Sequence, residues 1–278
     1  MTAILSRLRT RGWLTSAYML PLSAVMALPF YYVLVNTLKT QAQTTGSPLA
    51  LPTSPDFSTY RRVLDQVPVA AAFANTLYVT VFSVALMVLI GAMAAYALTI
   101  RPTRFNRRFG KLLLLAFVVP TQSTLIPVYQ IFVKLGLVNS LNGLVLVYSA
   151  GSIFCWFVIQ GYMATLPFEV IEAARLDGCG PWQVFWRIVL PLIRPILATV
   201  AVFQTMWIWN DFFTPNVYLS DPGKSTIVLE VYTSVGQFQV DWPAFLTLSV
   251  MALVPMVVFF VAVQRHIMSG LLSGAVKG

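Results

Sequence analysis

Charged residues are scarce in this chain of 278 residues: they make up 10% of it, against 58% hydrophobic residues. A soluble domain carries about a quarter charged residues, so the deficit excludes an ordinary soluble protein and indicates a membrane protein. His266 is the only histidine, which excludes a metal site built on histidines and argues against a histidine-based triad. The two cysteines, Cys155 and Cys179, stand in unrelated contexts and predict neither a disulfide framework nor a metal cluster. We therefore predict no catalytic and no metal site.

Long uncharged runs are abundant instead, and six of them are long enough to cross a membrane as helices. The predicted fold class is an all-α membrane protein with six transmembrane helices, at 12–38, 71–100, 112–133, 143–164, 188–209 and 244–264. Pro120 and Pro127 interrupt the third span, so we expect a kinked helix there. The segments 39–70 and 212–243 are predicted to be polar loops.

Six spans place both termini on the same side, and the basic residues identify that side as the cytoplasm. Thirteen basic and three acidic residues lie on the side of the termini, against five basic and six acidic residues on the other. The basic excess is spread over several cytoplasmic segments without one dominant patch. It therefore reflects membrane topology, and we expect no nucleic-acid partner.

The segment Asp221–Thr226 resembles the end of a phosphate-binding loop, with Gly223, Lys224 and Ser225 in sequence. The complete motif requires a glycine five positions before Gly223, and that position is Tyr218. The segment is also predicted to face away from cytosolic ATP. We expect no nucleotide or other cofactor in this chain, so energy must come from a partner.

A charged insert separates the fourth and fifth uncharged runs. It contains Glu169 and then the sequence EAARLDG, in which Glu172, Ala173, Ala174, Asp177 and Gly178 are the residues of interest. Pro167 suits a first helical position and Gly178 suits the left-handed residue that ends a helix. Gly180 and Pro181 then mark the start of a second helix. An ordinary cytoplasmic loop of a channel or secondary transporter is the alternative.

The spacing from the EAA residues through Gly178 to Ile188, Leu190 and Pro191 resembles the EAA loop of ABC importer permeases. Further resemblance lies in 120–129, in the turn 135–140, in Trp209-Asn210-Asp211 and in the closing residues 273–278. The chain is most similar to the second, six-span permease of maltose-type transporters, which implies the type I importer fold. It also implies domains at 1–70 (tail, first span and outer loop), 71–264 (core, with the coupling loop at 165–187) and 265–278 (cytoplasmic tail).

This resemblance implies a complex with a second permease, two ATPase subunits that bind ATP and Mg, and an extracellular or periplasmic solute-binding protein. The implied location is the bacterial or archaeal inner membrane, and the implied cargo is an oligosaccharide or disaccharide. An importer of a glycerol phosphodiester or a polyamine, a secondary transporter and a membrane-embedded enzyme are the alternatives.

Candidate pathway residues are polar or aromatic groups near the breaks in the third and fifth spans. Aromatic stacking and hydrogen bonds to sugar hydroxyls are the chemistry expected of them. The same groups can instead cap broken helices and satisfy backbone atoms. The candidates are Gln122, Thr124, Trp207, Asn210 and Asp211.

Overall fold

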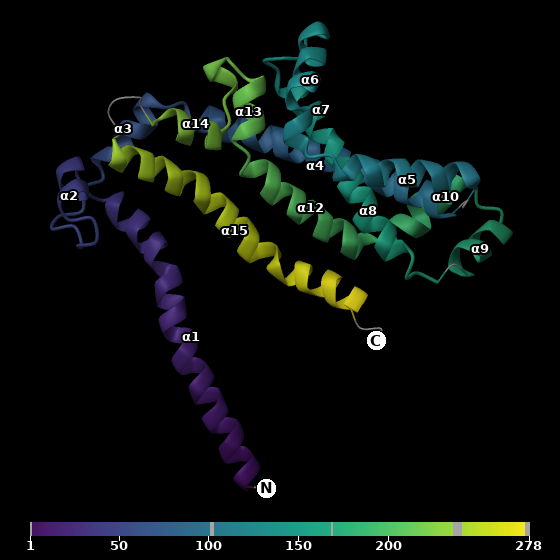
Figure 1. The fold of residues 1–278 in the computed structure, drawn as a ribbon, viewed down its shortest axis with the longest axis horizontal. Coiled ribbons are helices and arrows are strands. Elements are labelled where there is room, and N and C mark those ends of the chain that lie inside the picture. Colours follow the sequence, from purple (N-terminus) through teal and green to yellow (C-terminus); the bar gives the residue numbers. More distant parts are fainter. Residues whose placement is uncertain (1, 101–102, 168, 236–240, 276–278) are drawn as a thin grey trace. The chain divides into compact units, whose positions relative to one another are not determined.

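The structure is a computed structural model, and it describes the backbone of residues 2–100, 103–167, 169–235 and 241–275. Side chains are described from residue 17 to residue 264 within those ranges. All regular structure in the described residues is helical (Figure 1), which confirms the predicted all-α class. The helices are α1 (Thr2–Asn36), α2 (Gln41–Gly46), α3 (Ser58–Gln66), α4 (Val69–Ile100), α5 (Arg104–Val118), α6 (Thr121–Lys134), α7 (Leu141–Tyr148), η1 (Ser149–Gly151), α8 (Ser152–Met163), α9 (Glu169–Leu176), α10 (Pro181–Val184), η2 (Phe185–Val189), α11 (Leu190–Leu192), α12 (Arg194–Trp209), α13 (Phe213–Tyr218), η3 (Pro222–Lys224), α14 (Ile227–Thr233) and α15 (Trp242–Ala275).

Four stretches of helix are long and apolar enough to cross a membrane: Ala17–Asn36, Val69–Ile100, Leu141–Met163 and Trp242–Gln264. Two bent pairs also qualify if each pair counts as one span, which gives up to six. The pairs are Arg104–Val118 with Thr121–Lys134, bent by 100°, and Pro181–Leu192 with Arg194–Trp209, bent by 75°. Each of the six predicted spans overlaps one of these candidates.

The third predicted span is broken more sharply than a kinked helix. Val119 and Pro120 both adopt extended backbone between α5 and α6, because a proline disfavours the helical conformation of the residue before it. Pro127 instead lies inside α6. The expectation of one kinked helix at 112–133 is therefore corrected to two helices that meet at Pro120.

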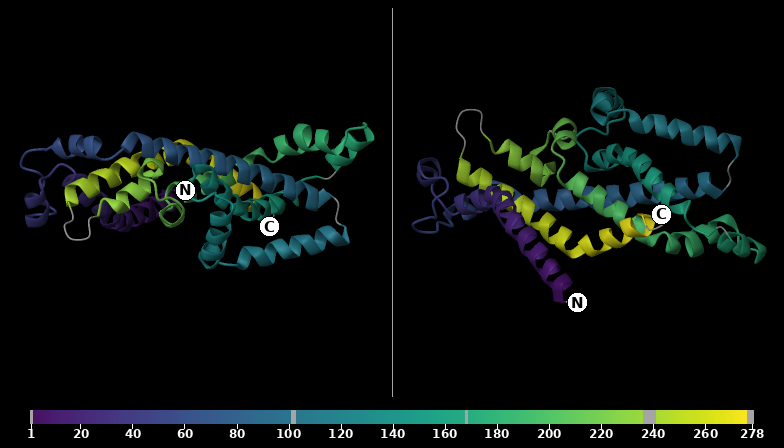
Figure 2. Two further views of the ribbon diagram at one scale, coloured as in Figure 1. Left: turned by 90° about the horizontal axis from the view of Figure 1, so that it is seen from above. Right: turned by 60° about the horizontal axis from the view of Figure 1, so that its bottom comes forward.

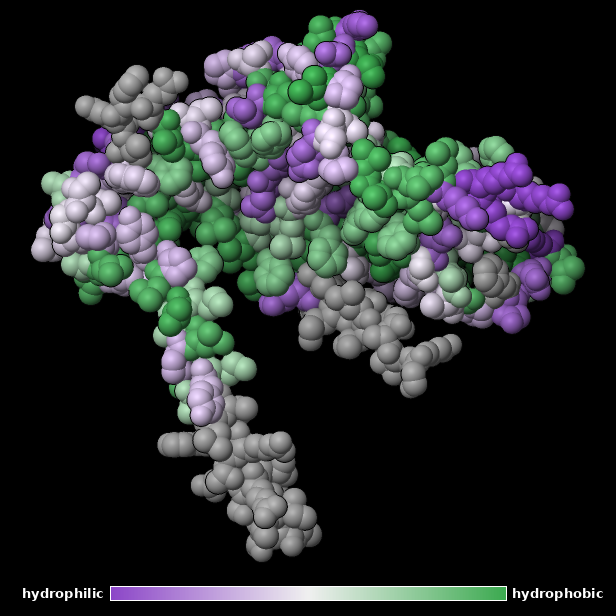
Figure 3. All heavy atoms as spheres, in the orientation of Figure 1, coloured by the Kyte–Doolittle hydropathy of each residue, from purple (hydrophilic) through white to green (hydrophobic). Residues whose placement is uncertain are grey.

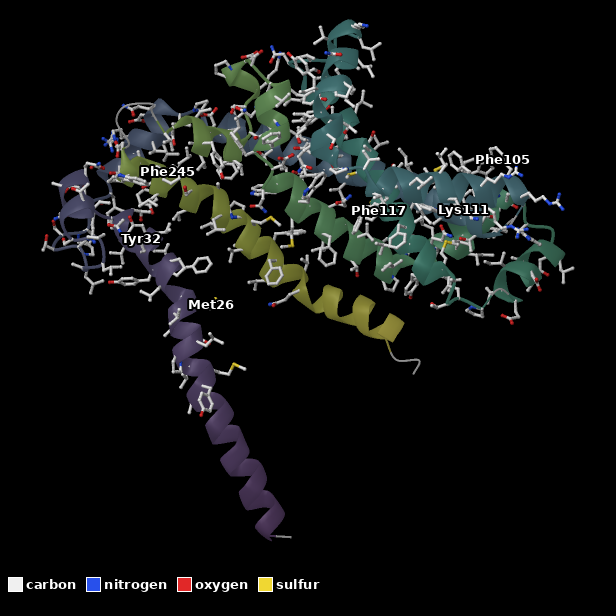
Figure 4. The ribbon with its side chains drawn as sticks, in the orientation of Figure 1. Met26, Tyr32, Phe105, Lys111, Phe117 and Phe245 are labelled. Carbon is white, nitrogen blue, oxygen red and sulfur yellow. The ribbon has the colours of Figure 1, made fainter. Side chains whose placement is uncertain are left out.

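The chain divides into two compact units. Unit 1 contains Met1–Val67 and Thr233–Leu253, and unit 2 contains Pro68–Tyr232 and Val254–Gly278. In unit 1, the first polar segment is tied to the start of α15 by an Arg62–Asp241 ion pair of 2.8 Å and by Trp242 N–H, which donates to Gln41 Oε1. Met26 on α1 and Phe245 on α15 are labelled in Figure 4.

The helix α4 is the centre of unit 2 and packs against α7, α8 and α12 (Figures 1 and 2). Gly91 lets α8 approach α4 closely, because a Cβ atom there would lie 2.5 Å from Cys155 Cβ on α8. Met87, Ala92 and Ala95 of α4 are fully buried in this contact region. Small residues let helices approach closely inside a membrane, where burial of apolar surface does not drive association.

The segment 212–243 is not the plain polar loop that we expected. It contains α13 and α14, and Tyr218, Ile227 and Leu229 are buried. Asn139 joins this segment to the turn before α7: its Oδ1 accepts from the N–H groups of Ser220 and Asp221. These contacts lie at the end of unit 2 that we call the α13 end.

Candidate coupling segment and cavity

The charged insert forms α9, which ends as the sequence predicts. Gly178 has φ +82°, the left-handed conformation that favours glycine. The N–H groups of Gly178 and Cys179 donate to the carbonyls of Arg175 and Ala174, at 3.1 and 3.0 Å. This pair of bonds is the Schellman motif, which satisfies carbonyls at the end of a helix. The end of α9 is therefore fixed by local sequence.

The two faces of α9 differ in burial. Ile171 and Ala174 are buried and belong to the hydrophobic core of unit 2. Glu169, Glu172, Ala173, Asp177 and Gly178 are exposed. Helical spacing places residues 169, 172 and 173 on one side, and Leu176 on that side is 89% exposed. The exposed side thus combines two carboxylates with a small residue and an apolar one.

The segment after α9 is anchored to α4. Tyr96 donates its hydroxyl to the carbonyl of Pro181 at 2.8 Å, and its ring lies 5.3 Å from that of Phe185. Gln183 caps the start of α10 by accepting from Gly180 N–H. Figures 1 and 2 show α9 and α10 beside the end of α4 that is far from α13. We call this end of unit 2 the α9 end.

The surface of α5 changes character along its length. At the α9 end it exposes Arg104, Arg107, Arg108 and Lys111, which is the hydrophilic region on that side of Figure 3. Further along it exposes Leu112, Leu115 and Val118. Figure 4 labels Phe105 and Lys111 at the charged end of α5 and Phe117 at the other end. The charged side chains of α5 therefore lie at its α9 end, and the exposed side chains from residue 112 onward are apolar.

A cavity of about 530 Å³ lies in unit 2 between the α5–α6 break, the α7–α8 span and α12. This volume falls in the range of small-molecule sites. The described residues that line it are aromatic, aliphatic or neutral polar, with none that is charged. They include Phe117, Thr121, Thr124, Tyr148, Gly151, Phe154, Phe203, Gln204, Trp207 and Thr214.

The structure brings together only two of the five candidate pathway residues at this cavity. Thr124 and Trp207 both line it, although the hydroxyl of Thr124 donates to the carbonyl of Thr121 at 2.8 Å. Gln122 is exposed on α6 and does not line the cavity. Asn210 is exposed at the end of α12, and its Nδ2 donates to the carbonyl of Met206 at 2.7 Å.

Asp211 forms hydrogen bonds to two residues that line the cavity. Its Oδ1 accepts from the N–H groups of Phe213 and Thr214, at 2.8 and 3.3 Å, and so satisfies the first two N–H groups of α13. Its Oδ2 accepts from the hydroxyl of Tyr148 at 2.8 Å. Because Tyr148 and Thr214 line the cavity, Asp211 positions two lining residues while not lining the cavity itself.

Sequence reasoning missed Tyr148 and Gln204. Gln204 is 5% exposed and is an amide inside an apolar run. A polar residue in such a run is a signal that could have identified it. Tyr148 carried no comparable signal, because its partner Asp211 is 63 residues away.

The segment that resembles a phosphate-binding loop is engaged within the protein. Lys224 Nζ donates to the carbonyl of Asn139 at 2.9 Å and lies 3.4 Å from Asp221 Oδ2. The carbonyls of Gly223 and Ser225 accept from Asn75 Nδ2, each at 3.0 Å. The segment thus attaches the α13 end to the start of α4.

Apolar helices of membrane-spanning length, a charged insert and a cavity inside one helical unit are the features of a membrane transport protein, and comparison with known proteins identifies the family. A model described as binding-protein-dependent transport system inner membrane component matches residues 87–271. The chain belongs to this family: it is a multi-pass inner membrane permease subunit of an ABC importer, not an enzyme itself. The system works with ATPase partners and a binding protein.

Individual relatives match most of the chain. The melibiose/raffinose/stachyose import permease protein MelC of Bacillus subtilis is 32% identical over 263 residues, covering 92% of this chain and 95% of MelC. The arabinooligosaccharides transport system permease protein AraQ of Halalkalibacterium halodurans is 33% identical over 206 residues, or 74% of each chain. A bacterial ABC transporter involved in the import of the acidic polysaccharide alginate has a chain of the same fold, with a TM-score of 0.83, 24% identity and coverage of 92% and 96%.

Proposed function

We propose that this permease carries an oligosaccharide or disaccharide through the cavity of unit 2. The observation that supports this is the lining, in which the half-exposed indole of Trp207 stands among hydroxyl and amide groups. Aromatic faces and neutral hydrogen-bonding groups suit sugars. A glycerol phosphodiester or a polyamine would require groups of opposite charge, and the described lining residues are all uncharged. The sugar names of the relatives point to the same class.

The proposed complex contains this chain, a second and different permease, two ATPase subunits that bind ATP and Mg, and the binding protein. The exposed side of α9, with Glu169, Glu172, Ala173, Asp177 and Gly178, docks on one ATPase. The buried side of α9 and the Tyr96 bond pass its movement to α4. In this proposal both termini and α9 are cytoplasmic, in line with the basic excess, and the α13 end faces outward.

The test is ATP hydrolysis by the whole complex in lipid nanodiscs, with binding protein and a panel of raffinose, maltotriose, diacetylchitobiose and arabinotriose. We expect at least one sugar to stimulate hydrolysis. Glu172→Lys should abolish this stimulation, because it places a cation on the docking side of α9. Asp65→Lys, an equal charge change at an exposed residue of α3, should not.

Two outcomes would contradict the proposal. Hydrolysis that responds to a polyamine or a glycerol phosphodiester but to no sugar would exclude the sugar assignment. A Glu172→Lys complex that assembles and still responds fully would exclude the docking role of α9.

A further inference from the structure

Gln204 has an unusual position for an amide in a membrane-spanning segment. It is nearly fully buried, yet it lines the cavity three residues before Trp207. Residues three apart lie on the same face of a helix. The cavity therefore receives an aromatic ring and an amide from adjacent turns of α12.

The amide hydrogens of Gln204 have only long contacts in this structure. Nε2 lies 3.3 Å from the carbonyl oxygen of Gly151, 3.7 Å from Cys155 Sγ and 4.0 Å from Met87 Sδ. An ordinary N–H···O bond is about 2.9–3.0 Å, and thiol and thioether sulfur atoms are weak acceptors. Buried polar groups normally have a good partner, so this donor is under-used.

Gly151 provides the space that the amide occupies. It lies in η1, where the fourth span changes from α-helix to a 3-10 turn. A Cβ atom at residue 151 would lie 2.8 Å from Gln204 Nε2 and would also meet the methyl group of Met87. The turn and the glycine together bring a carbonyl to the amide without a short bond.

We propose that Gln204 is a specificity-determining residue for the transported sugar. Its Nε2 exchanges the long contacts for a hydrogen bond to one hydroxyl oxygen of a sugar ring that lies against Trp207. An amide both donates and accepts, and so does a hydroxyl, so one side chain can read one hydroxyl position. This inference rests on the proposed sugar transport, and it adds the residue and the group that it recognises.

The experiment compares hydroxyl-deleted sugars in wild-type and variant complexes. The probe is the panel sugar that stimulates hydrolysis most, together with each of its monodeoxy derivatives, in nanodiscs with the binding protein. For each compound, the half-maximal concentration and the maximal rate are measured. Gln204→Met keeps the volume of the side chain and removes the amide. The binding protein is common to both complexes, so its own preferences cancel in the comparison between them.

We expect Gln204→Met to reduce the discrimination against one monodeoxy derivative by about three- to tenfold, the value of one hydrogen bond. Discrimination against the other derivatives should stay unchanged, because a purely structural role would affect all compounds alike. Gln160→Met, a glutamine of α8 outside the cavity, is the matched control and should change no ratio. If Gln204→Met does not assemble, Gln204→Asn retains the amide with a shorter reach and should show a smaller loss.

Unchanged ratios in the assembled variant, or an equal loss for every derivative, would overturn the assignment of Gln204 while leaving sugar transport intact. A wild-type complex that no sugar stimulates would instead refute the proposed function, and the inference with it. The two failures are therefore distinguishable in the same data set.

Discussion

The contact between α4 and α8 at Gly91 gives the sharpest prediction for the fold of unit 2. The perturbation is Gly91→Ala. The added Cβ atom would lie 2.5 Å from Cys155 Cβ, 2.9 Å from the nitrogen of Trp156 and 3.0 Å from the carbonyl carbon of Cys155. Carbon atoms prefer separations of about 3.5–4.0 Å, so the helices must separate by roughly 1 Å.

Two effects of opposite sign decide the magnitude. Alanine favours a helix over glycine by about 1 kcal/mol, whereas overpacking a filled core costs about 1–3 kcal/mol. Two of the three clashing atoms belong to the backbone of α8 and cannot rotate away, so we expect a cost at the upper end of that range. The net effect is a destabilisation of about 1–2 kcal/mol. The fraction of molecules in which α4 and α8 have separated and Cys155 is accessible should therefore rise roughly 5- to 30-fold.

The assay is the rate at which a maleimide modifies Cys155, which is fully buried, in a Cys179→Ser background. Gly91→Ala should accelerate the reaction by roughly 5- to 30-fold, and Gly91→Val by more. Gly161→Ala is the matched control, since no atom lies within 4 Å of a Cβ atom there. An unchanged rate in Gly91→Ala would refute the reasoning, as would equal acceleration in the control.

Three further predictions concern single residues. Gly178→Val should distort the end of α9 at a cost of about 1–2 kcal/mol, because φ is +82° there. Sugar-stimulated hydrolysis should fall in this variant, whereas Gly180→Ala, at φ −67°, should preserve the stimulation. Asp211→Ala should destabilise the complex by about 1–3 kcal/mol, measured as a lower Tm, because the first N–H groups of α13 and the Tyr148 hydroxyl lose their carboxylate acceptor. Asp211→Asn, whose Oδ1 can still accept from α13, should lose less, and equal losses would contradict this role. Burial lowers the pKa of Lys39 from 10.5. Between the lowered pKa and pH 10.5 the unfolded chain therefore binds more protons than the folded chain, and the free energy of unfolding should rise with pH in that window. The corresponding rise in Tm should be absent in Lys39→Met, and a rise of the same size in that variant would assign it to other groups.

Local signals in the sequence were sufficient for the end of α9, whereas Pro167, expected at the first helical position, lies outside the helix. Gly178 and the following Gly180-Pro181 pair set helix boundaries through backbone conformation alone, and the structure places them as predicted. The six uncharged runs likewise located every candidate span, because length and apolar composition are what crossing a bilayer requires.

The cavity depends on contacts between distant segments, and sequence patterns do not report these. The position of the Gln204 amide depends on its contacts with Gly151 and Met87, which are 53 and 117 residues away. Helices α13 and α14 were missed for a similar reason: the segment that joins them is held by hydrogen bonds to Asn139 and Asn75, which are distant in the sequence. The break at Pro120 was visible as a proline, but its angle of 100° was not.

One continuous helix, α4, is attached to both ends of unit 2. Near its start, Asn75 and Thr76 bind the segment 223–227, and near its end Tyr96 binds Pro181. At 1.5 Å per residue, these attachments are about 30 Å apart along the axis. A tilt of about 5° imposed at the α9 end therefore displaces the α13 end by roughly 3 Å, a distance comparable to a hydrogen bond. In the coupling that we propose, α4 would act as a lever arm: a small movement of the ATPase at the α9 end would change hydrogen-bond partners at the α13 end.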